Sequence, residues 1–222
     1  MSGACRPGGL ALTDRMLAAC AFPPGARVLD LGCGAGTSVA HLRRRGLEAW
    51  GLDRDRAALR GLGPFAPGGE AGSPGVPAAP AGSVVCARGE RLPFATGALD
   101  GVLMECSLSV ADAPDRVLAQ CRRALRPGGR LALADLYARG PEAPQASIRL
   151  ETRGALALRL EAHGFQVQRF EDCTRLLQAF FCQLILDPGA GGGRALAGSD
   201  PAALRAAKAG YCLLVARREA RP

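Results

Sequence analysis

The sequence predicts an α/β protein built on a mostly parallel β-sheet that helices cover on both faces. Short apolar runs alternate along the chain with longer segments of helical pattern, which is the order of strand–helix–strand units. Several of these runs are apolar throughout, as expected of strands that are buried on both faces. The 222 residues suit one domain with a sizeable core, and the 48% hydrophobic content excludes global disorder.

Local signals place the elements of the N-terminal half. Thr13 precedes a short helical pattern and predicts its N-cap, inside an N-terminal helical segment that covers residues 1–25. Gly46 predicts the end of the helix that follows the first strand. The predicted elements are a helix from Thr13 toward Cys20, a strand at 27–31, a helix at 38–45 and a strand at 48–53.

A segment of unusual composition follows at residues 61–83. It consists almost wholly of Gly, Pro, Ala and Ser, a density of breakers that no helix or strand tolerates. We expect a flexible surface insertion where a helix leads into the third strand, and not a domain boundary, so that residues 1–222 form a single domain. A lid over a substrate is the alternative interpretation.

The C-terminal half continues the alternation of strands and helices. The run Arg126-Pro127-Gly128-Gly129 is a strong stop signal at the end of a helix. The predicted strands are 84–87, 99–105, 130–136, 165–170 and 211–216, and the predicted helices are 114–125, 147–162 and 175–186.

A glycine-rich turn follows the first predicted strand, with the sequence Asp-Leu-Gly-Cys-Gly-Ala-Gly-Thr from Asp30 to Thr37. Glycines at alternate positions let the backbone turn sharply and approach a ligand closely. A dinucleotide-binding turn requires a glycine where Thr37 stands. Asp30 would repel a pyrophosphate, yet an acid at this position can hold an ammonium group. Asp53, which ends the second predicted strand, can accept hydrogen bonds from two ribose hydroxyls.

Further motifs follow the turn in order along the chain. The whole series is Asp30-x-Gly32-x-Gly34-x-Gly36, Asp53, Glu90-Arg91-Leu92-Pro93-Phe94, Leu125-Arg126-Pro127-Gly128-Gly129-Arg130-Leu131 and Glu161-Ala162-His163-Gly164-Phe165. It resembles the class I S-adenosylmethionine-dependent methyltransferases, especially the bacterial branch of ubiquinone/menaquinone C-methyltransferase-like enzymes, over roughly Ala26 to Arg217. The resemblance implies a Rossmann-like three-layer sandwich with a mostly parallel seven-stranded sheet and a final antiparallel strand. It also implies S-adenosylmethionine as the cofactor and a small molecule as the methyl acceptor.

The resemblance implies roles for single residues as well. Asp30 would hold the glycine-rich turn or the amino group of the cofactor, and Asp53 would bind its ribose. Arg54 would lie beside the edge of the adenine, and Tyr137 would border the acceptor pocket. The residues implied at the cofactor are Asp30, Gly32, Cys33, Gly34, Gly36, Asp53, Arg54, Gly89, Glu90 and Cys106, while Glu105, Cys106 and Ser107 would face the methyl group.

One position departs from the family pattern. Relatives usually carry Gly-Asp-Ala before the Glu-x-Leu-Pro-Phe run, and this aspartate accepts a hydrogen bond from the adenine amino group. Here Ala87, Arg88 and Gly89 stand at the aligned positions, so an arginine replaces the carboxylate. Either Glu90 or a backbone carbonyl substitutes for it, or the adenine is held mainly by apolar contact.

Methyl transfer needs a general base only when the acceptor must lose a proton. Glu105 is the candidate for that base, and its alternative role is to hold the cofactor or the backbone. Cys106 is interpreted as a buried thiol that lines the pocket, with a nucleophile or a metalloid ligand as the alternative. Two other classes of function stay open: an NAD(P)-dependent reductase, which the missing third glycine disfavours, and a non-catalytic S-adenosylmethionine-binding relic, which Arg88 favours.

Composition limits the partners and the compartment. The net charge of +8 comes from 28 basic against 20 acidic residues, but the arginines are scattered along the chain. In addition, no Asn/Asp-Pro-Pro-Tyr/Phe motif follows the fourth predicted strand. Nucleic acid is therefore not the expected substrate. We expect no membrane span, and a cytoplasmic location because no signal peptide is recognisable. Nine cysteines without a C-x-x-C pair predict reduced thiols and no metal site. The sequence does not indicate an oligomeric state.

Overall fold

The computed structural model describes residues 6–60, 84–140, 150–186 and 208–220. The predicted insertion at 61–83 therefore lies outside the described residues. In chain order the elements are α1 (Gly9–Cys20), β1 (Arg27–Leu31), α2 (Thr37–Arg44), β2 (Glu48–Asp53), α3 (Arg56–Arg60), β3 (Val84–Cys86), β4 (Leu99–Glu105), α4 (Pro114–Ala124), β5 (Leu125–Ala138), α5 (Arg153–Ala162), β6 (Phe165–Asp172), α6 (Thr174–Leu186) and β7 (Ala209–Arg218).

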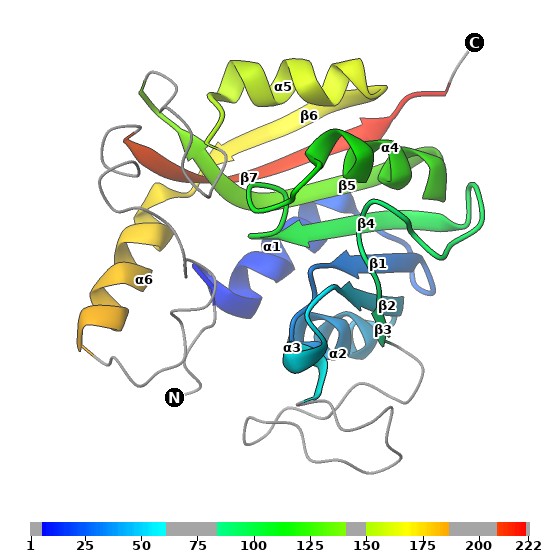
Figure 1. The fold of residues 1–222 in the computed structure, drawn as a ribbon, viewed down its shortest axis with the longest axis horizontal. Helices are drawn as coiled ribbons and strands as arrows, with labels where there is room; N and C mark the ends of the chain where they lie inside the picture. The colour runs from blue at the N-terminus through cyan, green and yellow to red at the C-terminus, as the bar shows by residue number, and fades with distance from the viewer. Residues whose placement is uncertain (1–5, 61–83, 141–149, 187–207, 221–222) are drawn as a thin grey trace.

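The strands form one seven-stranded sheet in the order β3-β2-β1-β4-β5-β7-β6 (Figure 1). β1, β2, β3, β4 and β5 pair in parallel, while β7 runs antiparallel to both of its neighbours, β5 and β6. This arrangement confirms the predicted mostly parallel sheet with a final antiparallel strand.

Two hydrophobic cores lie on the two faces of the sheet. One core packs α1, α2, α3 and α6 against one face, and the other packs α4 and α5 against the opposite face (Figure 1). Successive strand residues supply the two cores in turn: Leu103 of β4 belongs to the first core and Met104 to the second. The result is the expected three-layer sandwich. No helix in the described part of the chain is both long and apolar enough to cross a membrane.

The starts of two predicted helices were wrong. α1 begins at Gly9, so Thr13 is not its N-cap but lies inside the helix with a fully buried side chain. α5 begins at Arg153 and not at residue 147, because the hydroxyl of Thr152 caps the helix by accepting a hydrogen bond from the Ala155 N–H at 3.2 Å.

The order of the strands determines where a ligand can bind. From β1 the chain proceeds outward to β2 and β3 on one side, and then returns to β4 on the other side of β1. The carboxyl ends of β1 and β4 therefore border a topological switch point, where connections leave in opposite directions and a crevice opens. Asp30, Asp53 and Glu105 all lie at or next to the carboxyl ends of these neighbouring strands.

Candidate functional site

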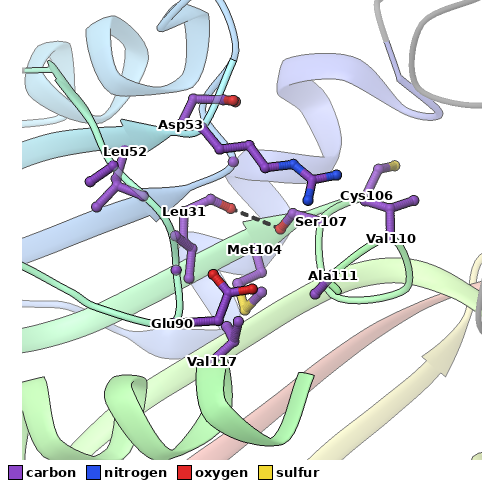
Figure 2. A pocket seen from close by; sticks show the side chains of 14 residues that line it. Leu31, Leu52, Asp53, Glu90, Met104, Cys106, Ser107, Val110, Ala111 and Val117 are labelled. Atoms are coloured by element: carbon purple, nitrogen blue, oxygen red, sulfur yellow. Dashed lines mark hydrogen bonds between the residues drawn. The ribbon is translucent and has the colours of Figure 1, made fainter. Parts of the chain in front are cut away.

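A cavity opens at the carboxyl ends of β1, β2 and β4, at the switch point of the sheet (Figure 2). Its empty volume is about 620 Å³, including the mouth that is open to solvent. The lining residues are Leu31, Gly32, Leu52, Asp53, Arg54, Ala87, Gly89, Glu90, Met104, Cys106, Ser107, Val110, Ala111 and Val117.

The glycine-rich turn forms one wall of the cavity and needs its glycines. Gly32 has a φ of +88°, and a Cβ at this position would lie 2.6 Å from the Cβ of Ser107. Ser107 itself donates a hydrogen bond to the carbonyl of Leu31 at 2.8 Å (Figure 2), which joins the loop after β4 to the end of β1. At Gly34, with a φ of +51°, a Cβ would meet no described atom within 4 Å, so the backbone is open on that side.

Asp53 connects the end of β2 to this turn. Its Oδ2 accepts a hydrogen bond from the Gly34 N–H at 2.8 Å, and its Oδ1 accepts one from the Asp55 N–H at 2.8 Å. Each carboxylate oxygen retains a further lone pair for a ligand, because a carboxylate has about four acceptor sites. Asp53 therefore both orders the wall and presents acceptors to the cavity.

Ion pairs join three segments at the mouth of the cavity. Arg54, after β2, donates to Asp112 Oδ2 at 2.7 Å, and Arg88, after β3, donates to the same oxygen at 2.5 Å. These two guanidinium groups lower the pKa of the Asp112 carboxyl. Arg88 Nε also lies 3.6 Å from Glu90 Oε2. Glu90 lines the cavity together with Met104 and Val117 (Figure 2), whereas Arg88 does not line it.

A buried polar cluster lies beside the inner end of the cavity. The Glu105 carboxylate accepts hydrogen bonds from Arg6 Nε, from the Thr13 hydroxyl at 3.1 Å and from the Ser38 hydroxyl at 3.2 Å. Glu105 is 7% exposed and is not a lining residue of the cavity. Donors from α1, from α2 and from the segment before α1 already occupy its carboxylate oxygens. The role of Glu105 as a general base stays a prediction.

Asp30 lies in the same region but has different surroundings. It is 2% exposed, and no described residue donates a hydrogen bond to its carboxylate. Burial and the negative charge of Glu105 raise its pKa to about 8, against the opposing effect of Arg6. A cationic group placed next to Asp30 would restore its ionised form.

Cys106 lines the cavity as a protonated thiol. Its Sγ lies 3.1 Å from the Tyr211 hydroxyl, which in turn donates to the carbonyl of Ala134 at 3.1 Å. Since the tyrosine proton is used on Ala134, the cysteine S–H donates to the tyrosine oxygen. Burial and the negative charges of Asp135 and Glu105 raise the pKa of Cys106 to about 12, against the opposing effects of Tyr211 and Arg6. A thiol of this kind is not an activated nucleophile.

A second buried carboxylate, Asp135 of β5, organises the loop after β4. It accepts hydrogen bonds from the N–H groups of Leu108 and Ser109 at 2.9 and 3.0 Å, from the Ser109 hydroxyl at 2.5 Å, and from its neighbour Leu136 at 2.8 Å. Burial nevertheless raises the pKa of Asp135. The loop that carries Val110 and Ala111 to the cavity is therefore fixed from the adjacent strand.

The structure brings part of the predicted site together at the cavity. The predicted residues that line it are Gly32, Asp53, Arg54, Gly89, Glu90, Cys106 and Ser107. Gly34 and Gly36 lie in the turn behind it, and the Cys33 thiol packs against Gly51, where a Cβ would approach the sulfur to 2.6 Å. Tyr137 is buried beside Phe170, with their ring centroids 5.3 Å apart, and does not line the cavity.

Sequence reasoning missed Arg6, Thr13, Ser38, Asp112 and Asp135. Arg6 meets Glu105 across 99 residues, and no local pattern marks such a contact. Thr13 and Ser38 are residue types that are common at helix starts, so their positions in the sequence did not indicate a contact with Glu105. The position of Asp112, in the loop after a strand whose carboxyl end borders the switch point, was the one available indication.

Residues 29–133 match the protein family described as Methyltransferase domain. The chain belongs to the class I S-adenosylmethionine-dependent methyltransferases. Methyltransferases of this family take S-adenosylmethionine as their cofactor, and the cavity of this chain lies beside the glycine-rich turn of the motif series.

Two curated relatives show the extent of the similarity. A malonyl-(acyl-carrier protein) O-methyltransferase of Methylococcus capsulatus is 32% identical over 168 residues, which cover 68% of this chain and 56% of that protein. A demethylmenaquinone methyltransferase of Beutenbergia cavernae is 34% identical over 121 residues, which cover 54% of this chain and 45% of that protein. The chain thus spans about half the length of the curated relatives that it matches.

Solved structures share the fold of this chain. The cyclase SpnF superimposes with a TM-score of 0.71 and 22% identity, covering 95% of this chain and 82% of that one. A geranyl diphosphate methyltransferase in complex with S-adenosylmethionine gives a TM-score of 0.68 and 19% identity, covering 95% of this chain and 85% of that one. One of the two is named as a cyclase, so the fold does not by itself decide the reaction.

Proposed function

We propose that this protein transfers a methyl group from S-adenosylmethionine to a small-molecule acceptor, as a single domain in the cytoplasm. One observation carries the proposal: the cavity lies at the switch point of the sheet, where the glycine-rich turn, Asp53 and Glu90 converge beside the buried carboxylate of Asp30. The nine cysteines, an odd number that cannot all pair within the chain, support a reducing compartment.

The residues of the cavity fit the parts of the cofactor. Asp53 offers two carboxylate oxygens for the ribose hydroxyls, and Glu90 offers an acceptor for the adenine amino group. Leu52, Met104 and Val117 supply apolar surface for the adenine ring. Asp30, which accepts no hydrogen bond from any described residue, suits a positively charged group such as the ammonium of the methionine part.

The chain contributes positioning to the reaction. The bound cofactor supplies an electrophilic methyl group on a sulfonium that is already a good leaving group. The protein therefore has to orient the acceptor and exclude water. We propose that Glu105 acts through its contacts with Arg6, Thr13 and Ser38 rather than as a proton acceptor, and that Cys106 shapes the cavity as a neutral thiol.

The proposal also concerns the chemical class of the methyl acceptor. The relatives are named for a malonyl group on a carrier protein and for demethylmenaquinone, so they represent two different acceptor classes. We propose a quinone-like ring as the first acceptor to test, because the motif series is most similar to that branch. A malonyl thioester is the second.

Binding and transfer are tested separately. Calorimetry should show that the purified protein binds S-adenosylhomocysteine, and incubation of a cell extract with tritium-labelled S-adenosylmethionine should give a labelled small molecule that depends on the protein. Binding without transfer to any acceptor would support the non-catalytic alternative. Quenching of nicotinamide fluorescence by the protein, in the absence of binding to S-adenosylhomocysteine, would support the reductase.

A matched pair of variants connects the binding to this cavity. Asp53→Ala should weaken S-adenosylhomocysteine binding by about 1.5–3 kcal/mol, as expected for lost hydrogen bonds to a charged group. Asp100→Ala is the control, since Asp100 also accepts a backbone N–H, from Arg27 at 2.8 Å, but lies at the opposite end of β4. An unchanged affinity in Asp53→Ala would remove Asp53 from the site.

A further inference from the structure

A second cleft opens at the same edge of the sheet as the cavity, between α1 and the start of α6. β4, β5 and β6 all end at this edge, because β7 runs antiparallel to both β5 and β6 (Figure 1). The empty volume of the second cleft is about 920 Å³, including the mouth that is open to solvent. Its charged lining residues are Arg15, Arg139, Asp172 and Arg175. Arginines from α1, from the segment after β5 and from α6 therefore line one opening.

Tyr211 of β7 lies between the second cleft and the cavity. Its hydroxyl is 3.1 Å from the Sγ of Cys106, which lines the cavity. Its backbone carbonyl accepts a hydrogen bond from the Cys173 N–H at 2.7 Å, and its N–H donates to the Thr174 hydroxyl at 3.2 Å. Cys173 and Thr174 both line the second cleft. The two openings are therefore neighbours, with one buried tyrosine between them.

Positive charge exceeds negative charge around the second cleft. Glu171 pairs with Arg15 and also accepts a hydrogen bond from Arg169 at 3.1 Å, so two guanidinium groups share one carboxylate. Arg175 is exposed to solvent and makes no hydrogen bond or ion pair with any residue that the structure describes. The charge of Arg175 is thus not balanced within this part of the chain.

The acid that lines the second cleft is engaged by the start of α6. Asp172 Oδ1 accepts hydrogen bonds from the N–H and from the hydroxyl of Thr174, the first at 2.8 Å. Arg139 donates through Nε to the carbonyl of Lys208 at 3.2 Å and interacts electrostatically with Asp172. Four guanidinium groups therefore stand against two carboxylates in and beside the second cleft, which leaves an excess of two positive charges. A planar guanidinium can donate two parallel hydrogen bonds to a phosphate or a carboxylate, so an oxyanion with two negative charges complements the second cleft.

We propose that the second cleft binds an anionic group of the methyl acceptor, a phosphate or a carboxylate, through Arg15, Arg139 and Arg175, while the accepting atom lies in the cavity beside Cys106. This inference rests on the proposed function. It narrows the quinone-like acceptor to a ring that carries an acidic substituent. It also accounts for the arginines of three separate segments at one opening, where their mutual repulsion opposes folding until an anion binds.

Binding of simple dianions tests the second cleft directly. Inorganic phosphate and succinate both carry two negative charges at slightly alkaline pH, so comparing them distinguishes a phosphate site from a carboxylate site. Calorimetry at constant ionic strength, with S-adenosylhomocysteine saturating the cavity, should show that one of them binds in the millimolar range. Arg139→Ala and Arg175→Ala should each weaken that binding by about fivefold or more, because a charge-assisted hydrogen bond is lost. Arg175→Lys should recover part of the loss, since an ammonium keeps the charge but not the planar fork.

Arg126→Ala is the matched control for these variants. Arg126 lies beside a carboxylate, with its Nε 2.5 Å from Asp100 Oδ1, but at the opposite end of the sheet. Its loss changes the net charge of the protein by the same amount. The affinity for the dianion should nevertheless stay within about twofold of the wild type, because salt screens charges at that separation.

The product of methyl transfer connects the second cleft to the acceptor. After a cell extract is incubated with tritium-labelled S-adenosylmethionine and the protein, the labelled product should be retained on an anion-exchange column, because it keeps its anionic group. Arg139→Ala and Arg175→Ala should need about five times as much extract for the same initial rate. Their maximal rate and their affinity for S-adenosylhomocysteine should equal those of the wild type, which separates acceptor binding from cofactor binding.

Three results would overturn the inference while leaving the proposed function intact. They are a labelled product that the anion-exchange column does not retain, failure of both dianions to bind, and an equal loss of dianion binding in Arg126→Ala and Arg175→Ala. Failure of the wild-type protein to bind S-adenosylhomocysteine, or to label any small molecule in the extract, would instead overturn the proposed function.

Discussion

Two buried aspartates, Asp135 and Asp30, differ in the hydrogen bonds that their carboxylates accept, and this difference separates a structural role from a ligand-binding one. Asp135 accepts four hydrogen bonds and holds a loop, whereas Asp30 accepts none from the described residues, although both are nearly inaccessible to solvent. Burying a carboxylate without partners favours its protonated form and costs stability once the group must ionise. We therefore expect that a neutral residue at the position of Asp30 would make the fold more stable.

The raised pKa of Asp30 predicts how stability changes with pH. The folded state holds the proton up to about pH 8, while the unfolded chain releases it near the ordinary value of 3.8. The folded state therefore binds more protons between these values, and this contribution to stability is lost as the pH rises through about 8. Asp30→Asn removes the effect, so its melting temperature should exceed that of the wild type by several degrees at pH 8, with a smaller difference at pH 5. Thermal melts of both proteins between pH 5 and 9 measure it.

Asp100→Asn is the control of opposite sign for this measurement. Burial raises the pKa of Asp100, but the Arg27 N–H and the Arg126 guanidinium outweigh it, so its pKa is lowered. That carboxylate contributes stability above its unfolded pKa, and Asp100→Asn should lower the melting temperature across the same range. Parallel melting curves of Asp30→Asn and the wild type from pH 5 to 9 would contradict the proposed protonation of Asp30.

Because Glu90 lines the cavity, we expect its carboxylate to bind the adenine amino group, although an arginine stands at position 88. Since Glu90 lines the cavity and Arg88 does not, Glu90→Ala should weaken S-adenosylhomocysteine binding by about 1.5–3 kcal/mol, whereas Arg88→Ala should change it little. S-inosylhomocysteine, which has an oxygen in place of the amino group, makes the test specific. The wild type should prefer the adenosine compound, and Glu90→Ala should lose that preference.

The aligned position offers a second check on this assignment. If Glu90 fills the role of the family's aspartate, Arg88→Asp should add almost nothing in the wild type, yet restore affinity in Glu90→Ala. Such non-additivity is expected when two residues compete for one amino group. Additive effects, or a preference for adenosine that survives Glu90→Ala, would place the adenine elsewhere.

At the scale of elements, the strands could be predicted closely and some helix ends could not. β1, β2 and β4 match their predicted bounds because they are short, apolar and flanked by breakers. α1 begins at Gly9 with no side-chain cap, so nothing local marks its start. Thr13 resembles a cap in sequence, but its hydroxyl instead contacts Glu105 across 92 residues, a contact that only the folded chain creates.

The N-cap of α5 gives a prediction at the same scale. Thr152 accepts a hydrogen bond from the Ala155 N–H at 3.2 Å, so Thr152→Ala should cost about 1 kcal/mol of stability. For a protein of this size that loss lowers the melting temperature by roughly 2–4 °C. Thr152→Ser keeps the hydroxyl and should retain most of the stability in calorimetric melts. A similar loss in both variants would mean that the threonine methyl, and not the cap, stabilises this helix start.

At the scale of the whole molecule, the mostly parallel sheet could be predicted because it depends on the order of apolar runs along the chain. The motif series also grouped Gly32, Asp53 and Glu90 at one ligand, and the structure places all three at one cavity. Asp53 ends a strand and the other two follow one, and parallel strands end at the same edge of the sheet. The Arg6–Glu105 cluster could not be predicted in this way. It depends on how α1 packs across the sheet, which no spacing in the sequence specifies.

The single sheet shared by two cores predicts that the molecule unfolds as one unit. Leu103 and Met104 are adjacent and fully buried, but they face opposite cores, and only Met104 lines the cavity. Either change to alanine should cost about 2–5 kcal/mol, while only Met104→Ala should weaken S-adenosylhomocysteine binding. In urea, the fluorescence of Trp50, the one tryptophan, reports the core that contains Met104, and circular dichroism reports all helices. The two signals should change together in both variants, because neither core keeps its strands without the other. Earlier loss of the Trp50 signal in Met104→Ala would show that the faces unfold separately.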